Sequence, residues 1–149
     1  MNTLRLENGK DYIELTVTGY EIENSGEDWL MVYGKLFTDG QLVEGKDAAV
    51  YVAELTKLRE WAEEQRCNKK TSKWFPVEPN LEFAYDWEKD ELTVYFFPEH
   101  EFYEKGIKKD RDGKEFYFTK SCRIPDFEKI IKWCDEVAES YPSGNNIVG

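Results

Sequence analysis

Apolar and polar residues alternate along the N-terminal third of the chain, which is the pattern of half-buried β-strands. The alternation is interrupted at Asn8-Gly9 and at Asp39-Gly40, two dipeptides typical of tight hairpin turns. Residues 29–37 carry apolar side chains on both faces, which predicts a central or covered strand. The expected strands are residues 4–6, 13–18, 29–37 and 48–52, joined as antiparallel hairpins.

Two segments have the spacing of amphipathic helices. In residues 53–66 apolar side chains recur every three or four positions, and residues 125–141 carry the strongest such stripe in the chain. Pro125 suits the first turn of the second helix, because its missing N–H needs no partner there. Asp126 suits the positive end of the helix dipole.

The chain between these helices predicts a loop and further strands. Residues 68–73 are polar, basic and aperiodic, so we expect a loop there. Alternation over residues 81–87 and 92–97 predicts a hairpin, and Phe116 and Phe118 indicate a last strand.

These elements predict an α+β fold in one domain over residues 1–149, with a flexible tail from about residue 143. We expect one mainly antiparallel sheet of about six to seven strands, with two amphipathic helices packed on it. Glycine-rich turns between strand and helix and alternating βα units do not occur, which argues against nucleotide-binding α/β folds.

Charge narrows the class of partner. The net charge is −11, and residues 7–54 hold eleven acidic residues against three basic ones. A field of that sign repels nucleic acid and anionic membranes and attracts basic partners. The partner predicted by charge is therefore a protein with a basic surface.

The chain lacks the apolar runs of targeted or membrane proteins. No stretch approaches the roughly 18 apolar residues of a membrane span, and the first residues lack a signal-peptide core, so we expect a cytoplasmic protein. Cys67, Cys122 and Cys134 are odd in number and irregularly spaced, which favours free thiols over disulfides or a metal site. No cofactor is predicted.

The sequence contains few residues that could form a catalytic site. No phosphate-binding loop, zinc spacing or hydrolase elbow occurs, and the one histidine, His100, lies in a charged segment between Glu99 and Glu101. The paired carboxylates around Asp86 and Asp90 sit at a turn, where water would keep them ionised. We predict that the protein is not an enzyme.

Two features are candidates for a binding role. Tyr20, Tyr33, Tyr95 and Trp133 are aromatic residues that could face a partner. The charged, aperiodic excursion over residues 98–114 is a candidate functional loop.

Several motifs occur together in the order seen in one family. They are Gly19-Tyr20-Glu21, Asp28-Trp29-Leu30, Glu54-Leu55 with Leu58 and Trp61, Glu78-Pro79-Asn80-Leu81-Glu82-Phe83, and a last apolar helix closing on Tyr141-Pro142. In this order they resemble the WapI-like immunity proteins. The resemblance implies a cytoplasmic antitoxin that binds the toxic C-terminal domain of a wall-associated or contact-dependent toxin, without catalysis. Many such toxins are nucleases, and hence basic where they meet nucleic acid.

The resemblance and the charge together give a first hypothesis, an immunity protein whose acidic residues dock on a basic toxin. The candidate contacts are Glu21, Glu23, Glu27, Asp28, Asp39, Glu44, Asp47, Glu99, Glu101 and Glu104. One alternative is a small metal-dependent hydrolase centred on Glu99, His100 and Glu101. Another is a general protein-binding adaptor, which the sequence does not separate from an immunity protein.

Overall fold

The computed structural model of the chain describes residues 2–22, 28–76, 81–96 and 117–142, without the side chains of residues 47–49. In chain order the elements are β1 (Thr3–Asn8), β2 (Asp11–Tyr20), β3 (Trp29–Thr38), β4 (Gln41–Tyr51), α1 (Val52–Asn68), β5 (Ser72–Trp74), β6 (Leu81–Asp86), β7 (Glu91–Phe96), β8 (Tyr117–Ser121) and α3 (Ile124–Ser140). The α+β class and both helices are confirmed.

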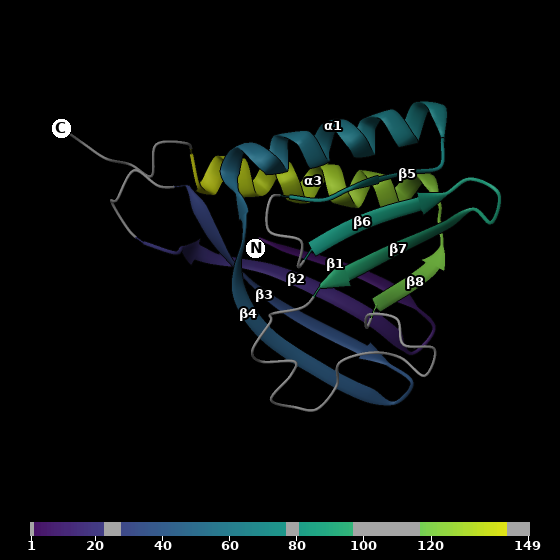
Figure 1. Cartoon of the computed structure of the whole chain (residues 1–149), viewed down its shortest axis with the longest axis horizontal. Helices are drawn as coiled ribbons and strands as arrows, with labels where there is room; N and C mark the ends of the chain where they lie inside the picture. Colours follow the sequence, from purple (N-terminus) through teal and green to yellow (C-terminus); the bar gives the residue numbers. More distant parts are fainter. Residues whose placement is uncertain (1, 23–27, 77–80, 97–116, 143–149) are drawn as a thin grey trace.

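The expectation of one sheet with six to seven strands is wrong. The described strands form two antiparallel sheets of four, sheet A in the order β1-β2-β3-β4 and sheet B in the order β5-β6-β7-β8. The reason is that α1 carries the chain away from β4, and the strands after it pair with one another. In Figure 1 the two helices lie together at the top, and the two sheets lie below them.

Both hairpin turns of sheet A follow the sequence signals. Asn8 pairs with Asp11 and Thr38 pairs with Gln41, so each turn has two central residues. Gly9, Asp39 and Gly40 have φ values of 62°, 52° and 74°, a region that glycine adopts freely and that aspartate tolerates. These short turns set the register within each of the two hairpins.

The loop expected over residues 68–73 is wrong at its end, where β5 begins. Trp74 is buried against the ring of Phe83, and the Trp61 indole N–H donates to Ser72 Oγ at 3.0 Å. A three-residue edge strand is too short to show the alternation of apolar and polar residues. Its exposed Lys73 is also a residue type common in loops. Contacts with side chains of α1 and β6 therefore hold this segment in place as a strand.

The second helix begins where the sequence indicated. The Arg123 backbone N–H donates to Asp126 Oδ2 at 2.8 Å, which caps the helix, and Pro125 lies in the first turn. Asp126 also accepts a hydrogen bond from Lys120 Nζ at 2.7 Å and is 3% exposed. A partly buried ion pair thus ties the end of β8 to the start of α3.

One hydrophobic core joins both sheets to the helices. Alternate residues of the strands in the two four-stranded sheets face inward and are buried, as are the apolar stripes of α1 and α3. Aromatic contacts hold the helices to sheet B: the Trp61 and Tyr85 rings both meet Phe127, at centroid distances of 6.1 and 5.6 Å. Each sheet therefore has one inner face in the core and one outer face.

Candidate functional site

The sequence-predicted acidic residues that the structure describes lie within and around sheet A. Glu21 follows β2, Asp28 precedes β3, Asp39 lies in the β3–β4 turn, and Glu44 lies within β4. β3 has ten residues, so Asp28 and Asp39 are separated by roughly 30 Å, given about 3.3 Å per residue. The acidic residues thus border sheet A at its two ends and do not form one patch. Their contact with a partner stays a prediction.

The other predicted contacts are placed less fully. Asp47 belongs to β4, but its side chain is outside the described part of the structure. Glu23, Glu27, Glu99, Glu101 and Glu104 lie outside the described residues, as does the predicted loop over residues 98–114.

One row of side chains crosses the outer face of sheet A with alternating charge. Arg5 lies opposite Glu14, Glu14 opposite Lys35, and Lys35 opposite Glu44, so the row runs plus, minus, plus, minus from β1 to β4. The guanidinium of Arg5 binds Glu14 at 2.5 Å. Cross-strand pairs of opposite charge stabilise an antiparallel sheet modestly. This row carries no net charge in a chain of −11.

The neighbouring row is aromatic. Tyr12 lies opposite Phe37 with the rings stacked at a centroid distance of 5.8 Å, and Phe37 lies opposite Leu42, which is 45% exposed. The guanidinium of Arg5 lies 4.1 Å from the centroid of the Tyr12 ring. Arg5 connects the aromatic row to the charged row, because its guanidinium also binds Glu7, which lies opposite Tyr12, at 2.6 Å. This bond lowers the pKa of the Glu7 carboxyl.

A second aromatic pair lies toward the other end of the face. Trp29 and Tyr51 lie opposite each other with ring centroids 3.7 Å apart, and Ile22, just after β2, is 52% exposed. Residues on this side of β2 and β3 are half-buried or exposed, so no element of the described part covers them. Rigid aromatic side chains on an uncovered face are the usual anchors of a protein–protein interface.

Two of the four aromatic candidates are buried, and the contact of the other two with a partner stays a prediction. Tyr20 is buried and donates from Oη to the Pro142 carbonyl at 2.7 Å, and Trp133 is buried with its indole N–H bonded to the Asn2 carbonyl at 3.1 Å. Both are core residues that tie distant segments of the chain together. Tyr33 and Tyr95 are half-buried and lie on outer faces, Tyr33 on sheet A and Tyr95 on sheet B.

Sequence reasoning missed Tyr12 and Phe37 as a pair. The signal was the hairpin register: the turn at Asp39-Gly40 places Phe37 opposite Leu42, and alternation places Tyr12 on the wet face of its strand. The pairing of Tyr12 with Phe37 itself needs the β2–β3 register, which no short turn sets.

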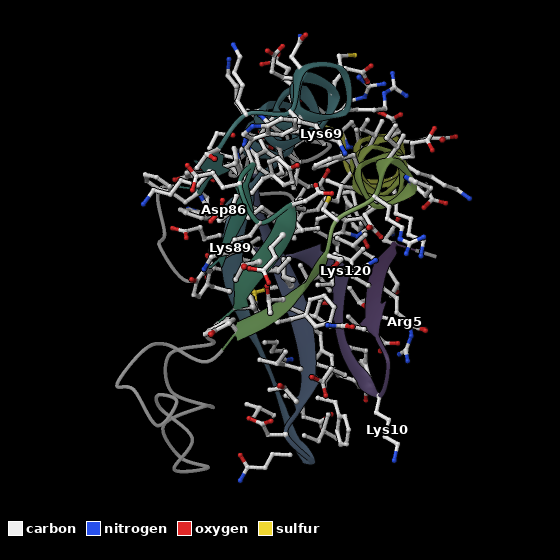
Figure 2. All side chains as sticks on the ribbon, turned by 90° about the vertical axis from the view of Figure 1, so that its right-hand side faces the viewer. Arg5, Lys10, Lys69, Asp86, Lys89 and Lys120 are labelled. Carbon is white, nitrogen blue, oxygen red and sulfur yellow. The ribbon has the colours of Figure 1, made fainter. Side chains whose placement is uncertain are left out.

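The outer face of sheet B holds a hollow of about 620 Å³. Its lining is rich in hydroxyl groups: Thr93 and Thr119 are hydrogen-bonded at 2.9 Å, and the rings of Tyr95 and Tyr117 are 5.3 Å apart. Figure 2 shows Asp86 and Lys89 together at the turn that closes one end, on a separate sheet from Arg5. The hollow could accept a polar group, but among the described residues neither a thiol nor an imidazole lines it.

The carboxylates of the β6–β7 turn, which were expected to be solvated, accept hydrogen bonds in and beside the turn. Asp86 Oδ1 accepts the backbone N–H groups of Glu88 and Lys89, at 3.0 and 3.3 Å. Asp90 accepts the Tyr85 hydroxyl and lies 3.7 Å from Lys69 Nζ. Burial and this carboxylate raise the pKa of Tyr85.

The described residues offer little for metal or nucleophilic chemistry. Among them no group of three His, Cys, Asp or Glu side chains could hold a metal ion. Cys122 and Cys134 are buried free thiols, and burial raises the pKa of each to about 12. Glu99, His100 and Glu101, the basis of the hydrolase alternative, lie outside the described residues.

Comparison with known proteins places the chain in a family. Of the helices in the described part of the chain, none has both the length and the hydropathy of a membrane span. No curated protein and no solved structure matches the chain. The model of the immunity protein WapI-like family matches residues 4–142, which is nearly the whole chain and includes every described element except the first residue of β1. The chain therefore belongs to the WapI-like immunity protein family.

Proposed function

We propose that this protein neutralises a cognate toxin by binding its toxic C-terminal domain in the cytoplasm, without catalysis of its own. The observation that carries the proposal is the family match over residues 4–142, since the family is one of immunity proteins. An immunity protein needs a surface that recognises one partner, and it needs no reacting groups.

The outer face of sheet A is the docking surface in this proposal. The stacked rings of Tyr12 and Phe37 lie on this face beside the β3–β4 turn, and aromatic residues dominate binding energy where they can be fully desolvated. Glu21 and Asp28 border one end and Asp39 the other, so acidic residues flank the anchors. Charges at a rim steer encounter and select partners, while the buried centre supplies most of the affinity.

The toxin in this proposal is a basic protein, and a nuclease is the class that fits best. A nuclease presents positive charge where it meets the phosphate backbone. A chain of net charge −11 is attracted to such a surface and, once docked, excludes the nucleic acid that competes for it.

The experiment is capture of the toxic domain encoded by the neighbouring gene on the immobilised protein, at low and at high salt. We expect stoichiometric capture whose association rate falls as salt rises, because steering by exposed charges is screened. Absence of capture at both salt concentrations would contradict the proposal.

A matched pair of variants tests the acidic border. The triple variant Glu21→Lys, Asp28→Lys and Asp39→Lys should associate at least about tenfold more slowly, because rim charges act chiefly on the association rate. The control carries the same change of charge on exposed helix positions, as Glu60→Lys, Glu64→Lys and Glu139→Lys. If both variants slow association equally, only the total charge matters and the border has no special role.

A further inference from the structure

We propose that the outer face of sheet A also binds a second copy of this chain, so that the free protein is a face-to-face homodimer. The inference starts from the order of charges in one row. Arg5, Glu14, Lys35 and Glu44 lie opposite one another across the four strands, with signs plus, minus, plus, minus.

A two-fold axis that runs along the strands, between β2 and β3, reverses such a row against itself. Arg5 of one copy then faces Glu44 of the other, and Glu14 faces Lys35. All four positions meet the opposite charge. An isologous interface requires this kind of self-complementarity, because the same patch serves both copies.

The same two-fold axis also brings the aromatic rows of the two copies together. Tyr12 and Phe37 occupy the two central strands, so the axis places Tyr12 of each copy on Phe37 of the other. Both rings are only half-buried in the single chain, and a facing sheet would remove them from water. Two sheets that stack face to face lie about 10 Å apart, a distance that such side chains can fill.

The available area sets the expected strength. Four strands about 4.8 Å apart, over the ten residues of β3 at about 3.3 Å each, give a footprint of roughly 600 Å² per copy. About 1,200 Å² in total is the lower limit for specific protein interfaces. The homodimer should therefore be reversible, with a dissociation constant on the order of 1–100 µM.

Overall repulsion does not forbid this contact. Each copy carries −11, but the twelve facing positions of the three complete rows include three cations, Arg5, Lys35 and Lys46, and three carboxylates, Glu7, Glu14 and Glu44. These three rows are neutral, and at physiological ionic strength charges more than about 8 Å apart are largely screened.

The test is sedimentation equilibrium of the purified protein without toxin, so its outcome is independent of the proposed function. Wild type should shift from monomer to dimer between about 1 and about 500 µM, a range that brackets the expected constant. A monomer throughout that range would overturn the proposal.

Two charge variants make the test specific to the row. Lys35→Glu alone sets two carboxylates together across the interface, because residue 35 faces Glu14 of the other copy. Glu14→Lys alone sets two cations together at the same place, so each variant should dimerise at least about tenfold more weakly. Mixed in equal amounts, the Lys35→Glu copy presents carboxylates at residues 14 and 35, and the Glu14→Lys copy presents ammonium groups at both. Both central contacts of the mixed dimer therefore join opposite charges. Native mass spectrometry should then show the mixed dimer and little of either homodimer.

The mixed dimer also shows that both variants are folded. Lys132→Glu and Glu139→Lys, on the exposed side of α3, carry the same charge changes away from the face and should dimerise like wild type. Wild-type dimerisation by both row variants, or no mixed dimer from their mixture, would refute the two-fold arrangement.

Discussion

Gly34, in the central strand β3, lies directly against the ring of Phe96 in β7. A Cβ atom at Gly34 would overlap Cδ2 and Cε2 of that ring, far inside van der Waals contact. Phe96 is enclosed by the core, so its ring has little room to move away. The missing side chain at residue 34 is therefore what lets the two sheets meet.

Substitution Gly34→Ala should lower the free energy of unfolding by about 1–3 kcal/mol, the usual cost of overpacking a rigid core. Chemical denaturation followed by tryptophan fluorescence measures this cost. In a double-mutant cycle, Phe96→Leu should recover part of the loss, because the smaller side chain leaves room for the methyl group. Strict additivity of the two changes would contradict the proposed contact.

Substitution Asp126→Ala should lower the free energy of unfolding by about 2–4 kcal/mol, because it removes the cap of α3 and leaves Lys120 without its partner. The matched control is Asp135→Ala, which removes the exposed ion pair to Arg59 and should cost less than about 1 kcal/mol. The free energy of unfolding is measured by thermal and by chemical denaturation. If both variants lost the same amount, burial of Asp126 would be unimportant.

Stability should fall above about pH 9 because of the two buried thiols. Burial raises the pKa of Cys122 and Cys134 from 9.0 to about 12, so in this window the unfolded chain loses protons that the folded chain keeps. The unfolded state then binds fewer protons, and the free energy of unfolding decreases as pH rises.

Urea unfolding at about pH 7.5 and about pH 10.5 measures this decrease. The variant Cys122→Ala with Cys134→Ala should show a smaller decrease than wild type. Cys67→Ala, which removes an exposed thiol, should leave the decrease unchanged. Identical pH dependence in all three proteins would exclude a contribution from the buried thiols.

Removal of the aromatic anchors should weaken toxin binding more than it weakens the fold. Phe37→Ala and Tyr12→Ala should each raise the dissociation constant at least about tenfold, as measured by calorimetry, with a small loss of stability. Tyr95→Ala is the control, since Tyr95 lies on the outer face of sheet B. A larger effect of Tyr95→Ala would move the toxin site to the hollow of sheet B.

Toxin binding and self-association should exclude each other, because both proposals place the partner on the outer face of sheet A. Toxin added to the concentrated protein should convert homodimers into complexes with one copy of each chain, and native mass spectrometry distinguishes these masses. A complex that contains two copies of the immunity protein would show that the toxin binds another surface.

The local elements could be predicted from residues that are neighbours in the chain. The turns at Asn8-Gly9 and Asp39-Gly40, the hairpin of β6 and β7, and the start of α3 at Pro125 depend on residues close together in the chain, so their chemistry is visible in the order of residues. The family motifs were visible for the same reason.

The neighbours of most strands could not be predicted in this way, because they depend on the packing of distant segments. Alternation tells that Tyr12 and Phe37 lie on wet faces, but their stacking depends on pairing between β2 and β3 across a long connection. The division into two sheets, the burial of Tyr20 and Trp133, and the strand at Ser72–Trp74 likewise rest on contacts between distant segments. Such contacts are chosen by the packing of the whole core, which no local pattern encodes.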